Sequence, residues 1–528
     1  MEADVIVVGG GIAGMAFAER MAALGGAGMR MLMLSKAPVE ASNSYLAQGG
    51  VATVVLPEDS VEQHVQDTLA VGAGRCDEHV VRLIVQEGPK AIQRLLEAGA
   101  RFDADAQGRL LLAREGGHSQ ARVVHHRDTT GAEIVRVLRR RVMEEPGIHV
   151  LEHQRVLDLL VVEEGGVKRC TGVLAMHEGT GKVARFEAGA VVLATGGAGQ
   201  VYQHTTNPPA ATGDGIAMAI RAGVPLRDMA FIQFHPTALF DPGAAATFLI
   251  SEAVRGAGAR LLRPDGALLM AGLHPKGDLA PRNVVAREIF RAMRQSGAPH
   301  VWLDTAPIGV KDFSRMFPNI ANTCGRLGIV GGRDRIPVMP AAHYSCGGIR
   351  TDDHGESALN NLFAVGECAS SGLHGADRLA SNSLLEALVM PQRAAERIAG
   401  AVIQPPVRGL PGQLPPIQPG LTSARADCLR AELKQLMTAN VGILRTLAGM
   451  EEARDRLDRI SAECEAALRK AEPAWAWFEL RDLAQVAAAI ARSALEQRTN
   501  AGAHWCEDLA AMPIAPGRQG SGAAADRT

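Results

Sequence analysis

The chain lacks most of the features that mark metal-binding, nucleic-acid-binding or membrane-spanning proteins. Its eight cysteines are scattered and no two form a C-x-x-C pair, which argues against zinc or iron–sulfur ligation by this chain. The formal net charge is only -2, so nothing indicates a nucleic-acid partner or an anionic membrane surface. Its apolar runs all fall short of the roughly 20 residues that a membrane span needs. We therefore expect reduced thiols, no metal and no membrane.

The bulk properties that remain are those of a globular protein. Hydrophobic residues make up 47% and charged residues 21% of the 528-residue chain, which is ordinary for this class. At this length about two to four domains are expected. A strand pattern starts at once at the N-terminus and leaves no room for a signal peptide, so we expect a cytoplasmic location.

A glycine run near the N-terminus is the most informative stretch. Residues 9–14 read G-G-G-I-A-G, which contains G-x-G-x-x-G between an apolar run (4–8) and an alanine-rich helical pattern (15–20). The glycines allow a tight turn and a close backbone approach, and the helix N-terminus attracts a pyrophosphate. The stretch predicts a dinucleotide site on an α/β, Rossmann-like domain, the alternative being an ordinary glycine-rich turn.

Two further strand patterns refine this prediction. Residues 29–34 read as a second parallel strand, but Ser35 and Lys36 follow where an NAD site has an acidic residue for the ribose. This argues against a plain NAD dehydrogenase. Residues 191–197 form another buried strand that runs into glycines, which suggests one extended cofactor crossing the sheet.

The rest of the chain divides by changes of pattern. Two helices are expected over 61–98 and one from 131 to about 142, with strands near 148–162, 169–177 and 183–188. The pattern changes at about 229 and returns to the strand–glycine style at 362. The predicted parts are a discontinuous dinucleotide-binding domain (1–228 and 345–402), an inserted α+β capping domain (229–344), a proline-rich linker (403–422), a helical domain (423–516) and a disordered tail (517–528).

A second helix start lies far along the chain. S-L-L-E at 383–386 matches a capping box, so Ser383 is predicted to begin a helix whose N-terminus favours negative charge. Reduced flavin carries such charge, so Ser383 and Leu384 are candidates to present backbone N–H groups to it; the alternative is a simple helix cap. Glu367 follows a strand and Gly366, and is a candidate acceptor for ribityl hydroxyls or else a solvated loop residue.

Several cationic or imidazole side chains stand in small or apolar surroundings in the middle of the chain. They are His235 in F-H-P-T, Arg255 in A-V-R-G-A, Arg282 in A-P-R-N-V, His343 in A-A-H-Y-S and Arg378 in A-D-R-L-A. Taken singly, each is more often a structural histidine or a surface arginine. Together they fit a dianionic substrate, because an unpaired buried cation is costly and arginine binds carboxylates bidentately.

Six motifs, in order, give the chain a family resemblance. They read S-Y-L-A-Q-G-G, A-T-G-G-A-G-Q-V-Y, T-G-D-G-I-A-M-A, F-H-P-T-A-L, H-Y-S-C-G-G and R-L-A-S-N-S-L-L-E. On these motifs the chain resembles the fumarate reductase/succinate dehydrogenase flavoprotein family from Asp4 to about Gly400, and more weakly to Trp505. The resemblance implies an α/β, Rossmann-like FAD-binding domain, an inserted α+β capping domain and a C-terminal helical domain.

The resemblance also implies roles for individual residues. The residues implied to contact FAD are Gly9, Gly10, Gly11, Ile12, Ala13, Gly14, Lys36, Asn43, Ser44, Tyr45, Leu46, Ala47, Gln48, Gly49, Gly50, Asp214, Glu367, Ser383 and Leu384. The residues implied to hold the substrate carboxylates are His235, Ser251, His343 and Arg378. His235 and His343 are counted with the catalytic residues, and Arg282 is implied to transfer the proton.

Two positions bring the chain close to one branch of the family. Respiratory members attach FAD covalently through a histidine at the position of Asn43, and asparagine cannot form that bond, so one non-covalent FAD is expected. R-E-G-G-H-S at 114–119 resembles the branch that oxidises L-aspartate, in which Glu115 orients the substrate with Arg255 as its companion. Aspartate is succinate with an ammonium group at C2, and one carboxylate in a cationic site favours that group by about 1 kcal/mol or more.

The resemblance further implies a reaction and its partners. L-Aspartate would be oxidised to iminoaspartate by hydride transfer from C2 to flavin N5, with oxygen, giving hydrogen peroxide, or fumarate as acceptor. Iminoaspartate is used by quinolinate synthase in NAD biosynthesis, and a transient contact with that enzyme stays open. One alternative is a soluble fumarate reductase or a succinate dehydrogenase flavoprotein subunit; as part of a membrane-bound complex such a subunit needs an iron–sulfur partner. Another is a non-catalytic, FAD-stabilised scaffold or interaction protein.

Overall fold

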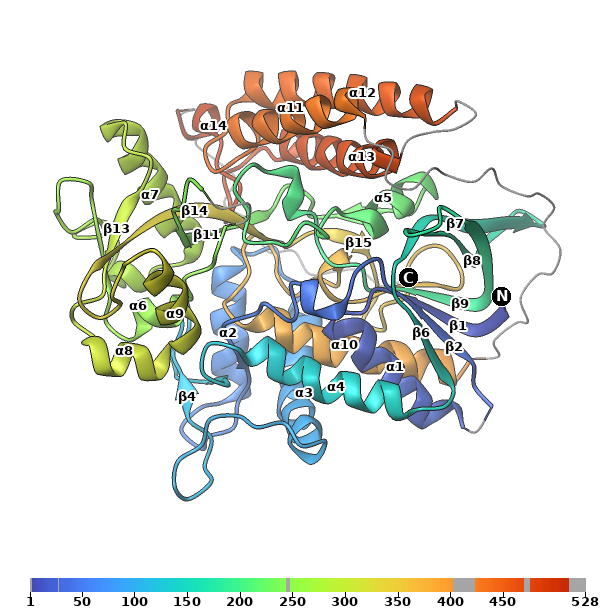
Figure 1. Cartoon of the computed structure of the whole chain (residues 1–528), viewed down its shortest axis with the longest axis horizontal. Helices are drawn as coiled ribbons and strands as arrows, with labels where there is room; N and C mark the ends of the chain where they lie inside the picture. Colours follow the sequence, from blue (N-terminus) through green and yellow to red (C-terminus); the bar gives the residue numbers. More distant parts are fainter. Residues whose placement is uncertain (1, 27, 244–246, 402–422, 470–474, 512–528) are drawn as a thin grey trace, which may run out of the picture.

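The computed structural model describes residues 2–26, 28–243, 247–401, 423–469 and 475–511. The predicted linker (403–422) and tail (517–528) lie outside the described residues. Figure 1 shows a large sheet with helices against it, a smaller sheet with its own helices at the left of the view, and a layer of long helices at the top.

A seven-stranded sheet organises the largest part. Its order is β6–β2–β1–β9–β8–β7, with β16 paired to β9 off this path. The strands are β1 (Glu2–Val8), β2 (Met31–Leu34), β6 (Ile148–Leu151), β7 (Gln154–Glu164), β8 (Val167–His177), β9 (Val183–Leu193) and β16 (Leu362–Ala364). β1 runs parallel to β2 and β9, as the apolar runs at 4–8 and 29–34 predict.

β9 (Val183–Leu193) is one continuous strand, whereas a strand at 183–188 and a separate one within 191–197 were expected. Its first half pairs antiparallel with β8, from Val183 to Glu187. Its second half pairs parallel with β1, and its last three residues also pair parallel with β16. The change of partners, rather than a break in the backbone, explains the change of sequence pattern along it.

Both faces of this sheet are covered by helices. Val5 and Val7 of β1 pack with one layer, and Ile6 and Val8 pack into the core on the other side, as the alternation of a strand requires. The first layer contains α1 (Ile12–Gly25), α2 (Val61–Val71), α3 (Glu78–Glu97), α4 (Thr130–Glu144) and α10 (Asn382–Ala399). The second face carries α5 (Asp214–Arg221) and the C-terminal helices.

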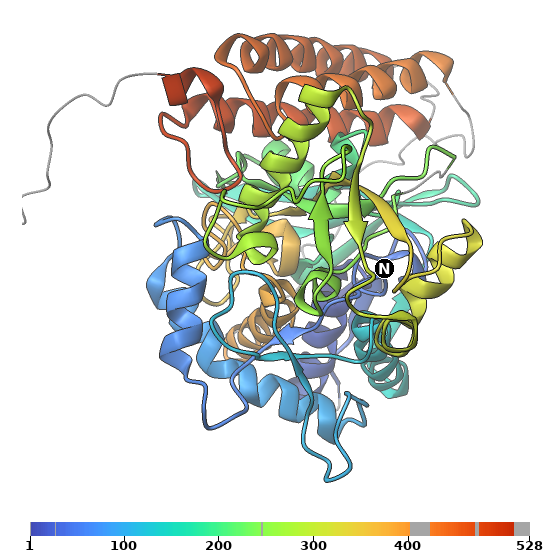
Figure 2. The same cartoon turned by 90° about the vertical axis from the view of Figure 1, so that its left-hand side faces the viewer.

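The inserted segment forms an antiparallel four-stranded sheet in the order β11–β14–β13–β12. Its elements are β11 (Ile232–Leu239), α6 (Glu252–Gly256), β12 (Arg260–Leu262), α7 (Arg282–Ser296), β13 (Val301–Asp304), α8 (Val310–Met316), α9 (Pro318–Arg326) and β14 (Arg335–Ser345). Figure 2 faces this sheet. Two three-stranded sheets join the parts, β3 (Val51–Ala52) with β5 (Val123–Val124) and β4 (Leu112–Ala113), and β10 (Leu226–Arg227) with β15 (Gly348–Arg350) and β17 (Ala369–Ser370).

The C-terminal helices are α11 (Ala424–Asn440), α12 (Leu447–Leu468), α13 (Trp475–Glu496) and α14 (Glu507–Ala511). α11 and α12 are separate helices, because Thr446 accepts the N–H of Gly449 and starts α12. α13 packs on α5, and through this contact the layer of C-terminal helices covers one face of the large sheet (Figures 1 and 2). Among the described residues, every helix is too short or too polar to span a bilayer.

Candidate active site

A cavity collects residues from both sheets. It is lined by residues that follow β1, β2, β9 and β16, and by side chains from β11, β14 and the start of α7. The first four strands are parallel, so their carboxyl ends meet at one edge of the large sheet, where ligands of α/β proteins bind. The four-stranded sheet supplies the opposite wall.

The glycine run forms one end of the cavity. Gly9 has φ +115°, and a Cβ there would lie 2.2 Å from the carbonyl oxygen of Ala194, so only glycine lets β1 and the end of β9 approach so closely. Ser44 accepts the N–H of Ile12 at 3.0 Å and so joins the S-N-S-Y loop to the first turn of α1. That turn presents backbone N–H groups that lack helical partners, which suits a pyrophosphate.

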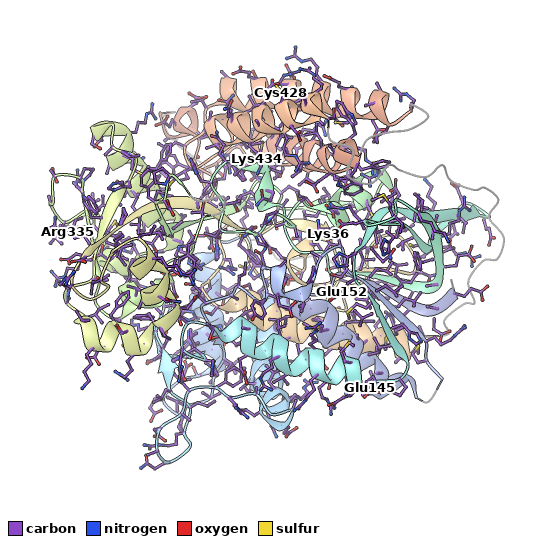
Figure 3. All side chains as sticks on the ribbon, viewed as in Figure 1. Lys36, Glu145, Glu152, Arg335, Cys428 and Lys434 are labelled. Carbon is purple, nitrogen blue, oxygen red and sulfur yellow. The ribbon has the colours of Figure 1, made fainter. Side chains whose placement is uncertain are left out.

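Charged residues predicted at the cofactor pair with one another along the same wall. Lys36, near the centre of Figure 3, donates to Asp214 at 2.6 Å and to Thr212 at 2.6 Å. Glu367 accepts from the backbone N–H of Ser345 at 3.0 Å and from the side chain of Asn43 at 3.5 Å. Burial raises the pKa of Glu367 to about 7. A carboxylate in such a place suits hydroxyl donors, so these residues fit FAD.

Two histidines face each other in the second part of the cavity. Their ring centroids are 5.1 Å apart. His235 Nδ1 accepts the backbone N–H of Thr237 at 3.2 Å, so the neutral ring carries its proton on Nε2. His343 Nδ1 lies 2.8 Å from Thr206 Oγ1. Burial, with nearby arginines, holds the pKa of both rings well below the ordinary value, so they are neutral donors at neutral pH.

The two arginines of the cavity share one acceptor. Gln233 Oε1 accepts from Arg282 Nη1 at 3.0 Å and from Arg378 Nε and Nη2 at 3.2 and 3.1 Å. The amide of Gln233 is oriented by its donation to Asp377 at 2.7 Å. The Arg378 guanidinium also lies over the ring of Tyr344, 4.3 Å from the centroid. The arrangement holds two cations side by side, which is the geometry that a pair of carboxylates needs.

A buried carboxylate links Arg282 to a second arginine. Glu252 is 1% exposed, accepts from Arg282 Nε at 2.6 Å and forms an ion pair with Arg255 at 3.0 Å. Burial opposes ionisation of Glu252, but Arg255 and Arg282 outweigh it and lower its pKa to about 2. The three residues form a continuous chain, Arg255–Glu252–Arg282, that ends in the cavity.

Glu115 is a second acid, beside Glu252, on the part of the cavity lining that carries the arginines and histidines. Its Oε2 accepts from the hydroxyl of Ser381 at 2.6 Å. Burial raises the pKa of this carboxyl, while Arg282 and Arg378 act in the opposite direction. Arg255, expected as the companion of Glu115 in orienting the substrate, forms its ion pair with Glu252, which stands one helical turn away on α6.

The predicted capping box at 383–386 is wrong. The helix begins at Asn382 with Ser381 before it, and Glu386 turns inward to His374 at 2.8 Å and to Ser371. Ser383 accepts a hydrogen bond from Arg378. The buried polar partners compete successfully with the cap because an acid at this position would otherwise be buried without a partner. Ser383 and Leu384 still lie in the first turn of α10, on the cavity.

The cavity brings together most of the residues predicted for the site. Those on its lining are Gly9, Gly10, Gly11, Ala13, Lys36, Asn43, Ser44, Leu46, Ala47, Gln48, Gly49, Gly50, Glu115, Asp214, His235, Ser251, Arg282, His343, Glu367, Arg378, Ser383 and Leu384. Ile12, Gly14, Tyr45 and Arg255 lie outside the lining. Sequence reasoning missed Gln233, Glu252 and Ser381, each of which adjoins a residue or motif already singled out, but only their contacts across the fold reveal them.

Comparison with known proteins agrees with this geometry. The family described as FAD binding domain matches residues 4–384, and the one described as fumarate reductase flavoprotein C-term matches residues 430–518. An L-aspartate oxidase of Streptomyces coelicolor is 42% identical, with 96% of this chain and 89% of that protein aligned. The chain belongs to the L-aspartate oxidases of the fumarate reductase and succinate dehydrogenase flavoprotein family.

Other members support the same placement. An L-aspartate oxidase of Yersinia pestis is 40% identical over 96% of each chain. Among solved structures, an E. coli quinol fumarate reductase matches with a TM-score of 0.84 and 30% identity, covering 96% of this chain and 91% of that one. The chain is therefore an FAD-dependent oxidoreductase with a Rossmann-like FAD-binding domain and a C-terminal helical domain.

Proposed function

We propose that the chain oxidises L-aspartate to iminoaspartate. The observation that carries this proposal is Glu115, a buried carboxylate on a cavity that also holds two arginines and two neutral histidines. The arginines and histidines suit a dicarboxylate, and Glu115 suits the ammonium group that distinguishes aspartate from succinate. A site for succinate alone gains nothing from this buried acid, because it adds negative charge beside a dianion.

The residues of the chain bind and orient the substrate. Arg378, the Nε2–H of His235 and the imidazole of His343 hold the two carboxylates, and Glu115 accepts from the amine at C2. Bound FAD supplies the hydride acceptor, at its N5 atom, for the hydrogen on C2. The amine must lose a proton before an imine forms, and positioning together with preorganised charge supplies most of the acceleration.

In the direction of fumarate reduction we assign to Arg282 the transfer of a proton to the substrate. Arginine is a poor acid by its reference pKa, so it needs a source that restores its proton. The Arg255–Glu252–Arg282 chain offers that source, because Glu252 contacts both guanidinium groups. Arg255, which lies off the cavity, then acts through Glu252 rather than by touching the substrate.

Oxygen, which would be released as hydrogen peroxide, or fumarate would serve as the final electron acceptor for bound FAD. FAD is held without a covalent bond, since Asn43 stands where a linking histidine would be needed. Iminoaspartate is the precursor that quinolinate synthase uses, so the reaction is assigned to the first step of NAD biosynthesis, in the cytoplasm. A transient contact with quinolinate synthase would protect the unstable imine.

Anaerobic mixing tests the proposal. The FAD-loaded protein is mixed with L-aspartate and, separately, with succinate, and flavin absorbance near its long-wavelength maximum is followed. We expect bleaching by aspartate alone and hydrogen peroxide when air is admitted. Bleaching by succinate alone would instead assign a fumarate reductase or succinate dehydrogenase activity, and copurification of an iron–sulfur subunit would support that alternative.

A smaller effect on fumarate binding is expected from the loss of the hydroxyl that contacts His343. Thr206→Val keeps the shape of the side chain but removes the hydroxyl that contacts His343 Nδ1. A hydrogen bond of this kind contributes about 1 kcal/mol, so the KM for fumarate should rise about fivefold with kcat nearly unchanged. Thr171→Val, which removes a hydroxyl bonded to Leu160 in the large sheet, is the control. Equal KM values for the two variants would remove Thr206 from substrate binding.

A further inference from the structure

Ser381 occupies an unusual place at the start of α10. Its φ is +64°, in the left-handed region that serine rarely adopts, and it stands directly before the first helical residue. A serine in this position ordinarily turns its oxygen onto the first helical turn as a cap. Here the hydroxyl donates to Glu115 Oε2 at 2.6 Å, and Ser381 Oγ itself accepts the backbone N–H of Gly50 at 3.3 Å.

A buried hydrogen-bond network connects the loop that carries Glu115 to the turn that carries Ser381. Arg122 is fully buried and donates to Asp59, Asp67 and, at 3.1 Å, to His118 Nδ1. The other ring nitrogen of His118 therefore carries the proton, and it donates to the carbonyl of Ala380 at 2.9 Å. This bond joins the two segments close to the Glu115–Ser381 contact, because His118 is three residues after Glu115 and Ala380 directly precedes Ser381.

We propose that Ser381 is a positioning residue that fixes Glu115 as the acceptor for the substrate amine and so determines selectivity for an amino acid over a plain dicarboxylate. This deepens the proposed function and rests on it. The hydroxyl occupies one lone pair of Oε2 and sets the rotation of the carboxylate. The second oxygen, Oε1, lies against Gly49, where an added Cβ would approach it to 3.2 Å, so a side chain at Gly49 would crowd it.

The same contact affects the protonation of Glu115. Burial raises the pKa of this carboxyl and Glu252 acts in the same direction, whereas Arg282, Ser381 and Arg378 lower it. Removal of the hydroxyl should therefore raise the pKa of Glu115 further. Because the ionised carboxylate accepts from the amine, the acidic limb of the aspartate kcat/KM profile should move to higher pH. A role in packing alone would leave that limb where it is.

Two substitutions separate the hydroxyl from the backbone. Ser381→Ala removes the hydroxyl and keeps the demanding backbone conformation, whereas Ser381→Gly removes the hydroxyl and relaxes it. We expect both variants, loaded with FAD, to lose about tenfold in kcat/KM for L-aspartate and to show the shifted acidic limb. Fumarate reduction should stay within about twofold, and the fumarate dissociation constant, from the change in flavin absorbance on titration, should not change.

Two comparison variants distinguish a positioning role of Ser381 from a purely structural one. Ser423→Ala removes a true cap on α11, where Ser423 accepts the N–H of Ala426, and should behave as wild type in every kinetic measurement. In a Glu115→Gln background, Ser381→Ala should add little, because Ser381 acts through Glu115. Additive losses, equal losses on aspartate and fumarate, or a loss in the alanine variant that glycine restores would overturn the proposal. A wild-type protein that fails to oxidise aspartate would instead overturn the proposed function.

Discussion

Replacing Arg282 with leucine is expected to lower fumarate reduction by about a thousandfold, the range in which a general acid contributes. The change removes the group that delivers the proton and leaves Glu252 bonded to Arg255 alone. FAD should stay bound, because the residues predicted to hold it lie on other parts of the cavity. Anaerobic re-oxidation of the reduced flavin by fumarate measures the loss, and the flavin absorbance of the purified protein reports cofactor content.

Arg287 provides a matched control on the same helix. It is only partly buried, and its guanidinium lies over the ring of Trp505, 4.0 Å from the centroid. Arg287→Leu therefore removes an arginine of similar size from α7 without touching the Arg255–Glu252–Arg282 chain. Fumarate reduction by Arg282→Leu within tenfold of the Arg287→Leu rate would remove Arg282 from proton transfer.

Glu115→Gln should separate the two activities. The change is nearly isosteric and still accepts from Ser381, but the carboxylate charge is lost. A hydrogen bond between charged groups contributes about 2 kcal/mol, so kcat/KM for L-aspartate should fall about 30-fold or more. Fumarate has no amine, and its reduction should stay within about threefold. Steady-state rates on both substrates, with the same protein preparation, measure the ratio.

Glu133→Gln is the control for that experiment. Glu133 is also a buried glutamate, but it belongs to α4 and bonds the backbone N–H of Arg101 and the side chain of Arg136. Its loss should leave the ratio of the two activities at the wild-type value. Equal losses on aspartate and fumarate in Glu115→Gln would contradict the role proposed for Glu115.

The N-terminal strand, glycine turn and helix could be predicted from short stretches of sequence, because each depends mainly on neighbouring residues. The apolar runs and the glycine turn at the N-terminus predict a parallel sheet with a helix over its end, and the structure confirms that arrangement. The continuity of β9 was missed, because its two halves take different partners and so carry different patterns.

The candidate site was predicted as a set of residues but not as a set of contacts. Motif positions identify Arg282, Arg378 and Glu115, yet the groups that hold them come from distant parts of the chain. Gln233 reaches Arg378 across 145 residues, and Ser381 reaches Glu115 across 266. A sequence shows residue types at a position, whereas a buried partner is selected by the packing of whole elements. The capping box was wrongly predicted for the same reason, because Glu386 forms a buried contact with His374 that the local sequence does not reveal.

The wide spacing of the cavity residues has a consequence for how the protein is made. β1 cannot complete its parallel pairing until β9 has been synthesised, and the wall formed by α10 needs residues up to about 384. Contacts of such long sequence separation are slow to form, and an emerging chain exposes apolar strand surface until they do. Because the contacts proposed between α10 and FAD are among the last that can form, we expect the chain to capture FAD late in synthesis. A chain that ends before α10 should emerge colourless, and the yellow of a full-length preparation reports the fraction of molecules that have completed the whole fold.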